Sequence, residues 1–260
     1  MALAHPVHAP AALRRLARPV LRAGVELALV LGLFQLYRWG RVLARGEELQ
    51  AFENAASVHQ LERALHLPSE AGLQAAVGSE HLLQLANVYY VSVHFPAMVA
   101  FLVWGYLCRP RAEYVWARNM VILMTGVALV VHVQFPLAPP RMLPQWGFID
   151  TMATYGPNAY AGASGAAVNQ FAAMPSLHVG WAALIAYVVH RTGPRWLAVI
   201  AAAHVVVTVA VVVVTANHYW LDGIVALVLL AVATRIVRPA AGPLAPPPAR
   251  RARSAATPRR

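Results

Sequence analysis

The sequence predicts an all-α integral membrane protein, a six-transmembrane-helix bundle with an extracytoplasmic amphipathic helical segment. Hydrophobic residues make up 59% of the 260 residues and charged residues only 12%, whereas a soluble domain carries about 25% charged residues. Several apolar runs approach the roughly 20 residues that cross a hydrocarbon layer. The chain has no lysine, and its arginines lie mostly in the two tails or beside the apolar runs, as topology signals do.

Six apolar segments are expected to span the membrane, and the fifth is the clearest because it is rich in valine and alanine. They divide the chain into a cytoplasmic N-terminal tail (1–22), a six-helix membrane domain (23–238) and a disordered basic cytoplasmic tail (239–260). The expected spans cover about residues 23–37, 88–107, 120–135, 175–190, 196–215 and 219–237.

The placement of arginine sets the expected orientation. Positive residues favour the cytoplasmic side, and the arginine-rich ends fall on one side if the N-terminus is inside. The opposite side carries fewer arginines, and acidic residues there offset their positive charge. We therefore expect a multi-pass protein of the cell membrane with both termini cytoplasmic. The net charge of +11 follows from these topology signals, so a nucleic-acid partner is not expected.

Two long connections fall on the outer side. Residues 41–87 carry large apolar side chains at roughly helical spacing among glutamates, which predicts one or two amphipathic helices on the membrane surface; a solvated spacer is the alternative. Residues 136–174 are rich in glycine, proline and alanine, and a loop of this length before a polar cluster indicates function. The apolar side chains of the first connection are Leu49, Phe52, Val58, Leu61 and Leu65.

Two polar clusters interrupt the apolar sequence: MPSLHVGW at 174–181 and NHYWLD at 217–222. The expected topology places both at outer helix ends, near PLAPPRMLP from the end of the third span. His218 and Asp222 are four residues apart, so on a helix they share one face. A carboxylate that binds one imidazole nitrogen leaves the other as a lone-pair donor, which is how a histidine nucleophile is oriented. A structural ion pair or helix cap is the alternative.

The first cluster has the composition of an anion site. Pro175 suits the first position of a helix, and the amides of this turn, which belong to Ser176 and Leu177, can bind phosphate at the helix N-terminus. His178 beside it can act as a general acid. Arg141, which follows two prolines, can bind a phosphate through two parallel hydrogen bonds. Phosphate is therefore the expected ligand.

PSLH followed by HYWLD resembles the second and third motifs of the type-2 phosphatidic acid phosphatase superfamily. AMPSLHVGW with NHYWLD is similar to its inositolphosphotransferase branch, which contains inositol phosphorylceramide synthase. The resemblance implies a six-helix bundle and metal-independent attack on a lipid phosphoester through a phosphohistidine. It implies that His218 is the nucleophile, that Asp222 orients it and that His178 protonates the leaving group.

The chain departs from the superfamily at two positions. The first motif of the superfamily begins with a lysine, for which Arg141 is the nearest counterpart. An arginine six residues before the nucleophile is replaced by Val212, as in the inositolphosphotransferase branch. Other polar residues near the expected site are candidates to surround it, with packed structural residues as the alternative, and His204 is expected to be structural. These candidates are His94, His132, Gln134, Asn217 and Tyr219.

Three other functions remain open. A metal-dependent hydrolase could use the two histidines and the aspartate as ligands. An intramembrane serine protease could use the motif GASG at 162–165, although the sequence that follows is not an apolar helix. A lipid transporter or flippase would need broken helices near the midplane. We expect an enzyme without cofactor or metal, acting on a phospholipid or other lipid phosphate in the bilayer, with water or a polyol as acceptor; the sequence does not decide between hydrolysis and transfer.

Overall fold

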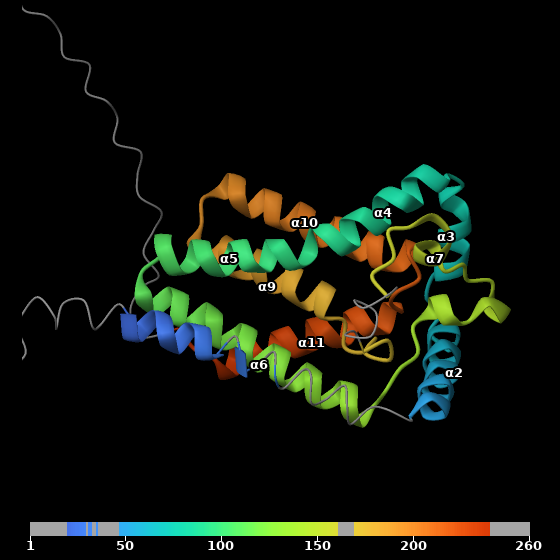
Figure 1. The fold of residues 1–260 in the computed structure, drawn as a ribbon, viewed down its shortest axis with the longest axis horizontal. Coiled ribbons are helices and arrows are strands. Elements are labelled where there is room, and N and C mark those ends of the chain that lie inside the picture. Colours follow the sequence, from blue (N-terminus) through green and yellow to red (C-terminus); the bar gives the residue numbers. More distant parts are fainter. Residues whose placement is uncertain (1–19, 30, 33–34, 36–46, 161–168, 240–260) are drawn as a thin grey trace, which may run out of the picture.

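The computed structural model of the chain describes residues 20–29, 31–32, 35, 47–160 and 169–239. The described residues are helical apart from their loops and one isolated bridge between Leu137 and Ala172. Figure 1 shows an elongated bundle of roughly parallel and antiparallel helices. The bundle helices are α4 (Glu80–Ser92), α5 (His94–Cys108), α6 (Arg111–Gln134), α9 (Leu177–Thr192), α10 (Arg195–Val214) and α11 (Trp220–Ile236).

One end of the bundle is covered by short elements. α2 runs across the helix ends in Figure 1, and α3 and α7 lie at the same end. The connection from α6 to α9 returns over this end and contains two short 3₁₀ turns. The covering elements are α2 (Glu48–Ala64), α3 (Glu70–Val77), η1 (Pro140–Met142), η2 (Pro144–Trp146) and α7 (Thr151–Tyr155).

Serine side chains define where three of the helices begin. The Oγ atoms of Ser69, Ser79 and Ser176 each accept a hydrogen bond from the backbone N–H three residues further on. This bond satisfies one of the N–H groups that a helix leaves free in its first turn. α6 and α10 instead follow prolines, which have no N–H to satisfy.

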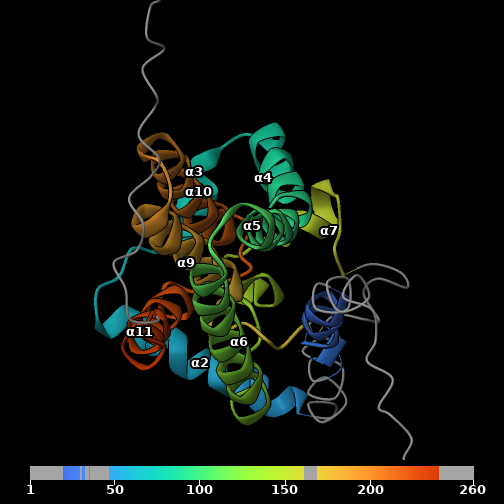
Figure 2. The ribbon, with the colours of Figure 1, turned by 90° about the vertical axis from the view of Figure 1, so that its left-hand side faces the viewer.

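α9 is the central helix of the bundle, because it packs against α5, α6, α10 and α11; Figure 2 shows this arrangement end-on. Small residues allow the close approach, as they do between membrane helices. A Cβ atom at Gly180 would lie 3.2 Å from Met124 Cε and 3.5 Å from Ala226 Cβ. The largest buried cluster has Met120, Met124, Leu184, Val188, Ala201 and Ala233 among its members.

Three of the described helices are long and apolar enough to cross a membrane: Glu80–Cys108, which comprises α4 and α5, and α6 and α10. The helix pair α4–α5 is broken at Val93, a residue of the turn between the two. α9 and α11 occupy the expected fourth and sixth spans but contain only 16 and 17 residues. Over the residues that the structure describes, the protein is therefore an all-helical membrane protein.

Some expectations fall partly or wholly outside the described residues. Residues 23–29 of the expected first span are helical, and Glu26 in this segment forms ion pairs with Arg111 (3.0 Å) and Arg118 (2.8 Å) of α6. The GASG motif lies outside the described residues, and so do almost all residues of the two tails, 1–22 and 239–260.

The outer segment between the first two spans is helical, as predicted, in α2 and α3. Its large apolar side chains lie mostly on the side that does not pack on the protein. Val58 is buried, but Leu49, Phe52, Leu61 and Leu65 are exposed. The face of α2 that packs on the protein is formed by Ala51, Ala55, Val58 and Glu62, since small side chains let the helix lie close to the bundle end.

The predicted helix start at Pro175 is wrong. α9 begins at Leu177, and Ser176 is its N-cap with extended backbone angles. The reason is that the Ser176 hydroxyl accepts from the Val179 N–H at 3.3 Å, and serine is a preferred N-cap. His178 still lies in the first turn. α6 also begins at Arg111, nine residues before the expected third span.

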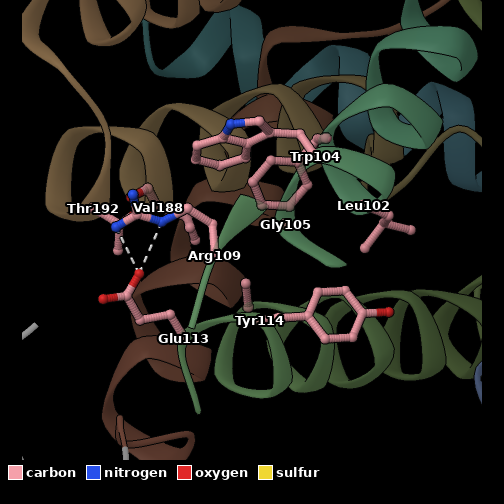
Figure 3. A pocket seen from close by; sticks show the side chains of 10 residues that line it. Leu102, Trp104, Gly105, Arg109, Glu113, Tyr114, Val188 and Thr192 are labelled. Atoms are coloured by element: carbon pink, nitrogen blue, oxygen red, sulfur yellow. Dashed lines mark hydrogen bonds and ion pairs between the residues drawn. The ribbon is translucent and has the colours of Figure 1, made fainter. Parts of the chain in front are cut away.

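At the opposite end from α2, a cavity of about 10 Å³ lies between α5, α6 and α9 (Figure 3). This volume is about that of one water molecule. Both Nε and Nη2 of Arg109 donate to Glu113 Oε2, at 2.9 and 2.7 Å, and the guanidinium lies 5.6 Å from the Trp104 ring centre. An ion pair between consecutive helices closes this end, so it offers no room for a substrate.

Candidate active site

The two polar clusters of the sequence meet at the covered end of the bundle. His218 lies in the turn between α10 and α11, and Asp222 lies in the first turn of α11. Asp222 Oδ2 is 3.1 Å from His218 Nδ1, and the Ala173 carbonyl is 2.9 Å from the same nitrogen. Both oxygens are acceptors, so Nδ1 carries the proton and Nε2 presents a lone pair.

His178 faces this lone pair. Its Nδ1 lies 3.4 Å from His218 Nε2. The ring of Tyr90 stacks against His178 at 4.2 Å between centres, and the ring of His94 lies at 4.3 Å. Tyr90 and His94 are one helical turn apart on either side of the break at Val93. The contacts from α4 and α5 therefore fix the plane of the His178 ring.

The backbone joins the two clusters directly. The Ser176 N–H donates to the backbone carbonyl of Asp222 at 3.0 Å, so the start of α9 is attached to the first turn of α11. The N–H groups of Asn217 and His218 donate to the Val212 carbonyl, at 3.1 and 3.2 Å. The Val212 side chain packs with Val179 and Val213, an apolar environment in which an arginine would not fit.

Arg141 lies beside the site but is held by other protein groups. Its Nε donates to Asn217 Oδ1 at 3.1 Å, Nη1 pairs with Asp150 Oδ2 at 3.4 Å and Nη2 contacts Gln170 Oε1 at 3.5 Å. Its guanidinium also lies 3.8 Å from the centre of the Tyr160 ring. The backbone N–H of Arg141 donates to the Ala216 carbonyl at 2.7 Å. A phosphate would have to replace some of these partners to bind Arg141.

A pocket of about 140 Å³ opens between the two histidines and the loop from α6 to α9. Both histidine rings and Asn217 line it, together with side chains that donate and accept hydrogen bonds without charge. The complete lining is Tyr90, His132, Pro139, Tyr160, Asn169, Gln170, Ala172, Ala173, Leu177, His178, Asn217 and His218.

The structure brings most of the expected site residues together. Leu177, His132 and Asn217 line the pocket, and His132 Nε2 lies 3.2 Å from the Pro175 carbonyl. Ser176 is buried behind the pocket as the helix cap. His94 reaches the site through the His178 ring.

Three residues lie apart from the pocket. Gln134 is exposed at the end of α6. Tyr219 is buried, and its hydroxyl donates to the Ala138 carbonyl at 3.2 Å. His204 hydrogen-bonds through Nδ1 to the Tyr89 hydroxyl at 2.5 Å, and its ring centre is 6.5 Å from that of His94.

Sequence reasoning missed four polar residues of the pocket lining: Tyr90, Tyr160, Asn169 and Gln170. The loop from α6 to α9 was expected to be functional, and three of the four come from it. No pattern in the loop marked individual residues. Tyr90 lies in an apolar run, and only the fold shows that its hydroxyl is 3.1 Å from that of Tyr160. Tyr160 in turn donates to Asn217 Oδ1 at 3.2 Å.

A buried carboxyl pair lies next to the site, outside the membrane-spanning helices. Glu62 of α2 and Glu70 of α3 are each 3% exposed. The pKa of Glu62 is raised to about 9, mainly by burial and to a smaller extent by the neighbouring Glu70 carboxyl. Burial also lowers the pKa of His59, one turn earlier in α2, where the imidazole stacks on Trp146 at 4.4 Å.

Within the described part of the chain, no three His, Cys, Asp or Glu side chains are grouped so that they could hold a metal ion. The histidine pair and Asp222 are arranged as a hydrogen-bonded series, in which Asp222 and Ala173 bind Nδ1 of His218 and His178 faces Nε2. This geometry fits an oriented nucleophile with an acid beside it.

Comparison with known proteins agrees with this chemistry. The sequence model of the PAP2 superfamily matches residues 56–236, from the middle of α2 to the end of α11. No curated protein and no solved structure matches the chain significantly. The matched range contains His178, His218, Asp222, Arg141, the second half of α2 and the other covering elements. The chain therefore belongs to the PAP2 superfamily and is a phosphatase-type membrane enzyme.

Proposed function

We propose that the protein is a lipid phosphatase or phosphotransferase that cleaves a phosphoester or phosphodiester through a phosphohistidine on His218. The observation that carries this proposal is the double acceptor at His218 Nδ1, from Asp222 Oδ2 and the Ala173 carbonyl. It leaves the Nε2 lone pair directed into a pocket and toward His178. A histidine held in this way is a nucleophile for phosphorus.

In the first step the Nε2 lone pair forms a bond to phosphorus while the bond from phosphorus to the leaving oxygen breaks. His178 donates a proton to that oxygen. In the second step His178 accepts a proton from water or an alcohol, whose oxygen attacks phosphorus and breaks the P–N bond. The 3.4 Å between the two nitrogens is too short to hold a phosphoryl group in line, so the rings separate when substrate binds.

The phosphate would bind at the first turn of α9, where Leu177 lines the pocket, with Arg141 as the charged partner. The Ser176 N–H is already bound to the Asp222 carbonyl, so it is not free to bind phosphate as expected from the sequence. Arg141 reaches Asn217, Asp150 and Gln170 in the unliganded protein. A phosphate carries more negative charge than the Asp150 carboxylate and accepts two parallel hydrogen bonds from a guanidinium. Substrate binding would therefore exchange Asp150 for phosphate.

The site would act at the outer face of the cell membrane, with both termini in the cytoplasm. Side chains such as Leu107, Val199 and Val206 are about 70% exposed on α5 and α10, as expected for helices that face acyl chains. The lipid tails would lie against these helices in the bilayer, with the phosphate in the pocket. His94 and His132 would hold the histidine pair from the membrane side.

The acceptor would be a neutral polyol of the inositol type or water. The pocket wall contributed by Tyr160, Asn169 and Gln170 offers hydroxyl and amide groups that can bind an alcohol. These groups carry no formal charge, so they provide no second phosphate site. In the specific form of this proposal, an inositol-phosphate-type headgroup is transferred: the inositol then belongs to the donor lipid and stays on the phosphorus bound to His218, and a different alcohol is the acceptor.

The test is incubation of the purified protein with labelled phosphatidic acid and, separately, labelled phosphatidylinositol, each with and without free polyols. We expect turnover of at least one lipid, acid-labile label on the protein, inhibition by vanadate and no loss of activity with chelators. Product release that no polyol changes would remove the transferase form. Turnover that chelators abolish would favour a metal hydrolase, and lipid movement without any turnover would favour a transporter. His218→Gln provides the inactive control.

A further inference from the structure

The first N–H groups after His218 are each bound by a different carboxyl group. The Tyr219 N–H donates to Asp222 Oδ2 at 3.0 Å, the Trp220 N–H to Glu70 Oε1 at 3.2 Å and the Leu221 N–H to Glu62 Oε1 at 2.8 Å. Asp222 belongs to α11 itself. Glu62 and Glu70 come from α2 and α3, about 150 residues earlier in the chain.

These bonds attach the covering helices to the turn that carries His218. The connection between α2 and α3 adds another bond, because the Trp220 indole N–H donates to the Pro68 carbonyl at 2.8 Å. Gln74 of α3 extends the attachment, since its Nε2 donates to the Val214 carbonyl at the end of α10. The turn between α10 and α11 is thus fixed from outside the bundle on both sides of His218.

We infer that Glu62 and Glu70 are positioning residues for the phosphoryl-transfer reaction, which set the place of His218 by holding the first turn of α11. This inference rests on the proposed function of His218. The carboxyl groups do not touch the pocket, so they act through the backbone of Trp220 and Leu221. A change of a few tenths of an ångström in this turn alters the approach of Nε2 to phosphorus, on which such reactions depend strongly.

A second negative charge on this pair is unfavourable. Both carboxyl groups are buried and bind adjacent N–H groups, and two like charges at that distance repel strongly in a medium of low dielectric constant. The pKa of about 9 for Glu62, raised by burial and by Glu70, agrees with this repulsion. The other titratable groups that face the pair are Asp222, Tyr219 and His59.

The inference predicts how activity depends on pH. Above about pH 9 Glu62 loses its proton, the two carboxylates repel and the first turn of α11 shifts. Glu62→Gln keeps an oxygen acceptor for the Leu221 N–H but cannot ionise. The ratio of kcat for wild type to kcat for Glu62→Gln is therefore expected to fall about tenfold between pH 7 and pH 10, since ionisation increases tenfold per pH unit. Other groups that titrate in both proteins change the two kcat values equally, so they leave the ratio unchanged.

Three further variants make the test specific. Glu53→Gln changes an exposed glutamate on the same helix and should follow wild type at every pH. Glu70→Gln removes the repulsion and should flatten the alkaline limb as Glu62→Gln does. Glu62→Ala leaves the Leu221 N–H without its acceptor, so its kcat should be lower throughout while KM for the lipid stays within about twofold.

A constant ratio between pH 7 and 10, with wild type active and folded by its melting curve, would overturn the inference and leave the proposed function intact. Absence of turnover in wild type at every pH would instead overturn the proposed function. A fall in the ratio that is matched by unfolding of wild type at pH 10 would also overturn the inference, because it would show a role in stability alone.

Discussion

Replacement of Asp222 by asparagine tests which group sets the protonation of His218. In catalytic triads with a serine nucleophile, the same change costs about 10⁴ in kcat because the histidine adopts the wrong tautomer. Here the Ala173 carbonyl lies 2.9 Å from His218 Nδ1 and can only accept a hydrogen bond. It keeps the proton on Nδ1 in the variant, so Nε2 retains its lone pair.

The decrease in kcat for Asp222→Asn should therefore come only from loss of the charged hydrogen-bond acceptor, because the tautomer of His218 is unchanged. A hydrogen bond to a charged group contributes about 1.5–3 kcal/mol, which corresponds to a roughly 10- to 150-fold decrease in kcat. The asparagine amide would also take the place of Asp222 Oδ1, which is buried without a hydrogen-bond partner among the described residues. We expect this to lower the free energy of unfolding by about 1–3 kcal/mol.

The assay compares kcat for release of labelled phosphate from lipid micelles at pH 7 among wild type, Asp222→Asn and His218→Gln, with the melting temperature of each. Rapid acid-free quenching and gel analysis report the phosphohistidine. A decrease of 10⁴ or more in a folded Asp222→Asn protein would show that the Ala173 carbonyl does not hold the tautomer. A decrease below threefold would show that Asp222 does not stabilise the charge on His218.

Three further changes test other parts of the structure. Arg141→Lys should lower kcat/KM about 10- to 100-fold, because lysine lacks the planar fork that spans three partners and stacks on Tyr160; an unchanged kcat/KM would remove Arg141 from phosphate binding. Gly180→Ala should be tolerated, since the flexible end of Met124 can yield, whereas Gly180→Val should cost about 1–3 kcal/mol of stability through overpacking; equal melting temperatures would contradict the close packing of α9. The folded-state pKa of Glu62, about 9, exceeds its ordinary value of 4.5. Between about pH 4.5 and pH 9 the unfolded chain therefore loses this proton while the folded protein keeps it, so wild type is destabilised progressively as the pH rises. Glu62→Gln should gain melting temperature over wild type across that window, and a constant difference would refute the buried, protonated state.

The sequence contained enough information for the chemistry and less for its surroundings. The spacing of His218 and Asp222 and the cost of placing ionisable groups in apolar sequence predicted the two clusters, and the resemblance of PSLH and HYWLD to known motifs indicated the family. Helical periodicity predicted α2 but not its inner face. Alanines form that face, and only the fold shows that the bundle end requires small side chains there.

Long-range contacts explain the remaining differences. The bond from Glu62 to the Leu221 N–H connects residues 159 positions apart, and no local pattern indicates such a pair. The role of Tyr90 depends on the break at Val93. Pro96 has no N–H to donate to the Ser92 carbonyl, a local cause of this break that the expected continuous span at 88–107 did not take into account. The start of α9 was misplaced by two residues because proline and serine both favour helix N-termini, and the hydroxyl of Ser176 decides between them.

The break between α4 and α5 has a consequence for how deep the chemistry lies. α5 runs from His94 to Cys108, a rise of about 21 Å, and Arg109 and Arg111 follow at its charged end. If this end marks one boundary of the ~30 Å hydrocarbon layer, the ring of His94, and His178 against it, lie roughly 9 Å beneath the other boundary. A lipid phosphate would then have to move deeper into the membrane than the phosphates of the surrounding lipids in order to react, and water is scarce at that depth. A phosphohistidine formed at this depth would last longer before hydrolysis, which gives an alcohol time to reach it.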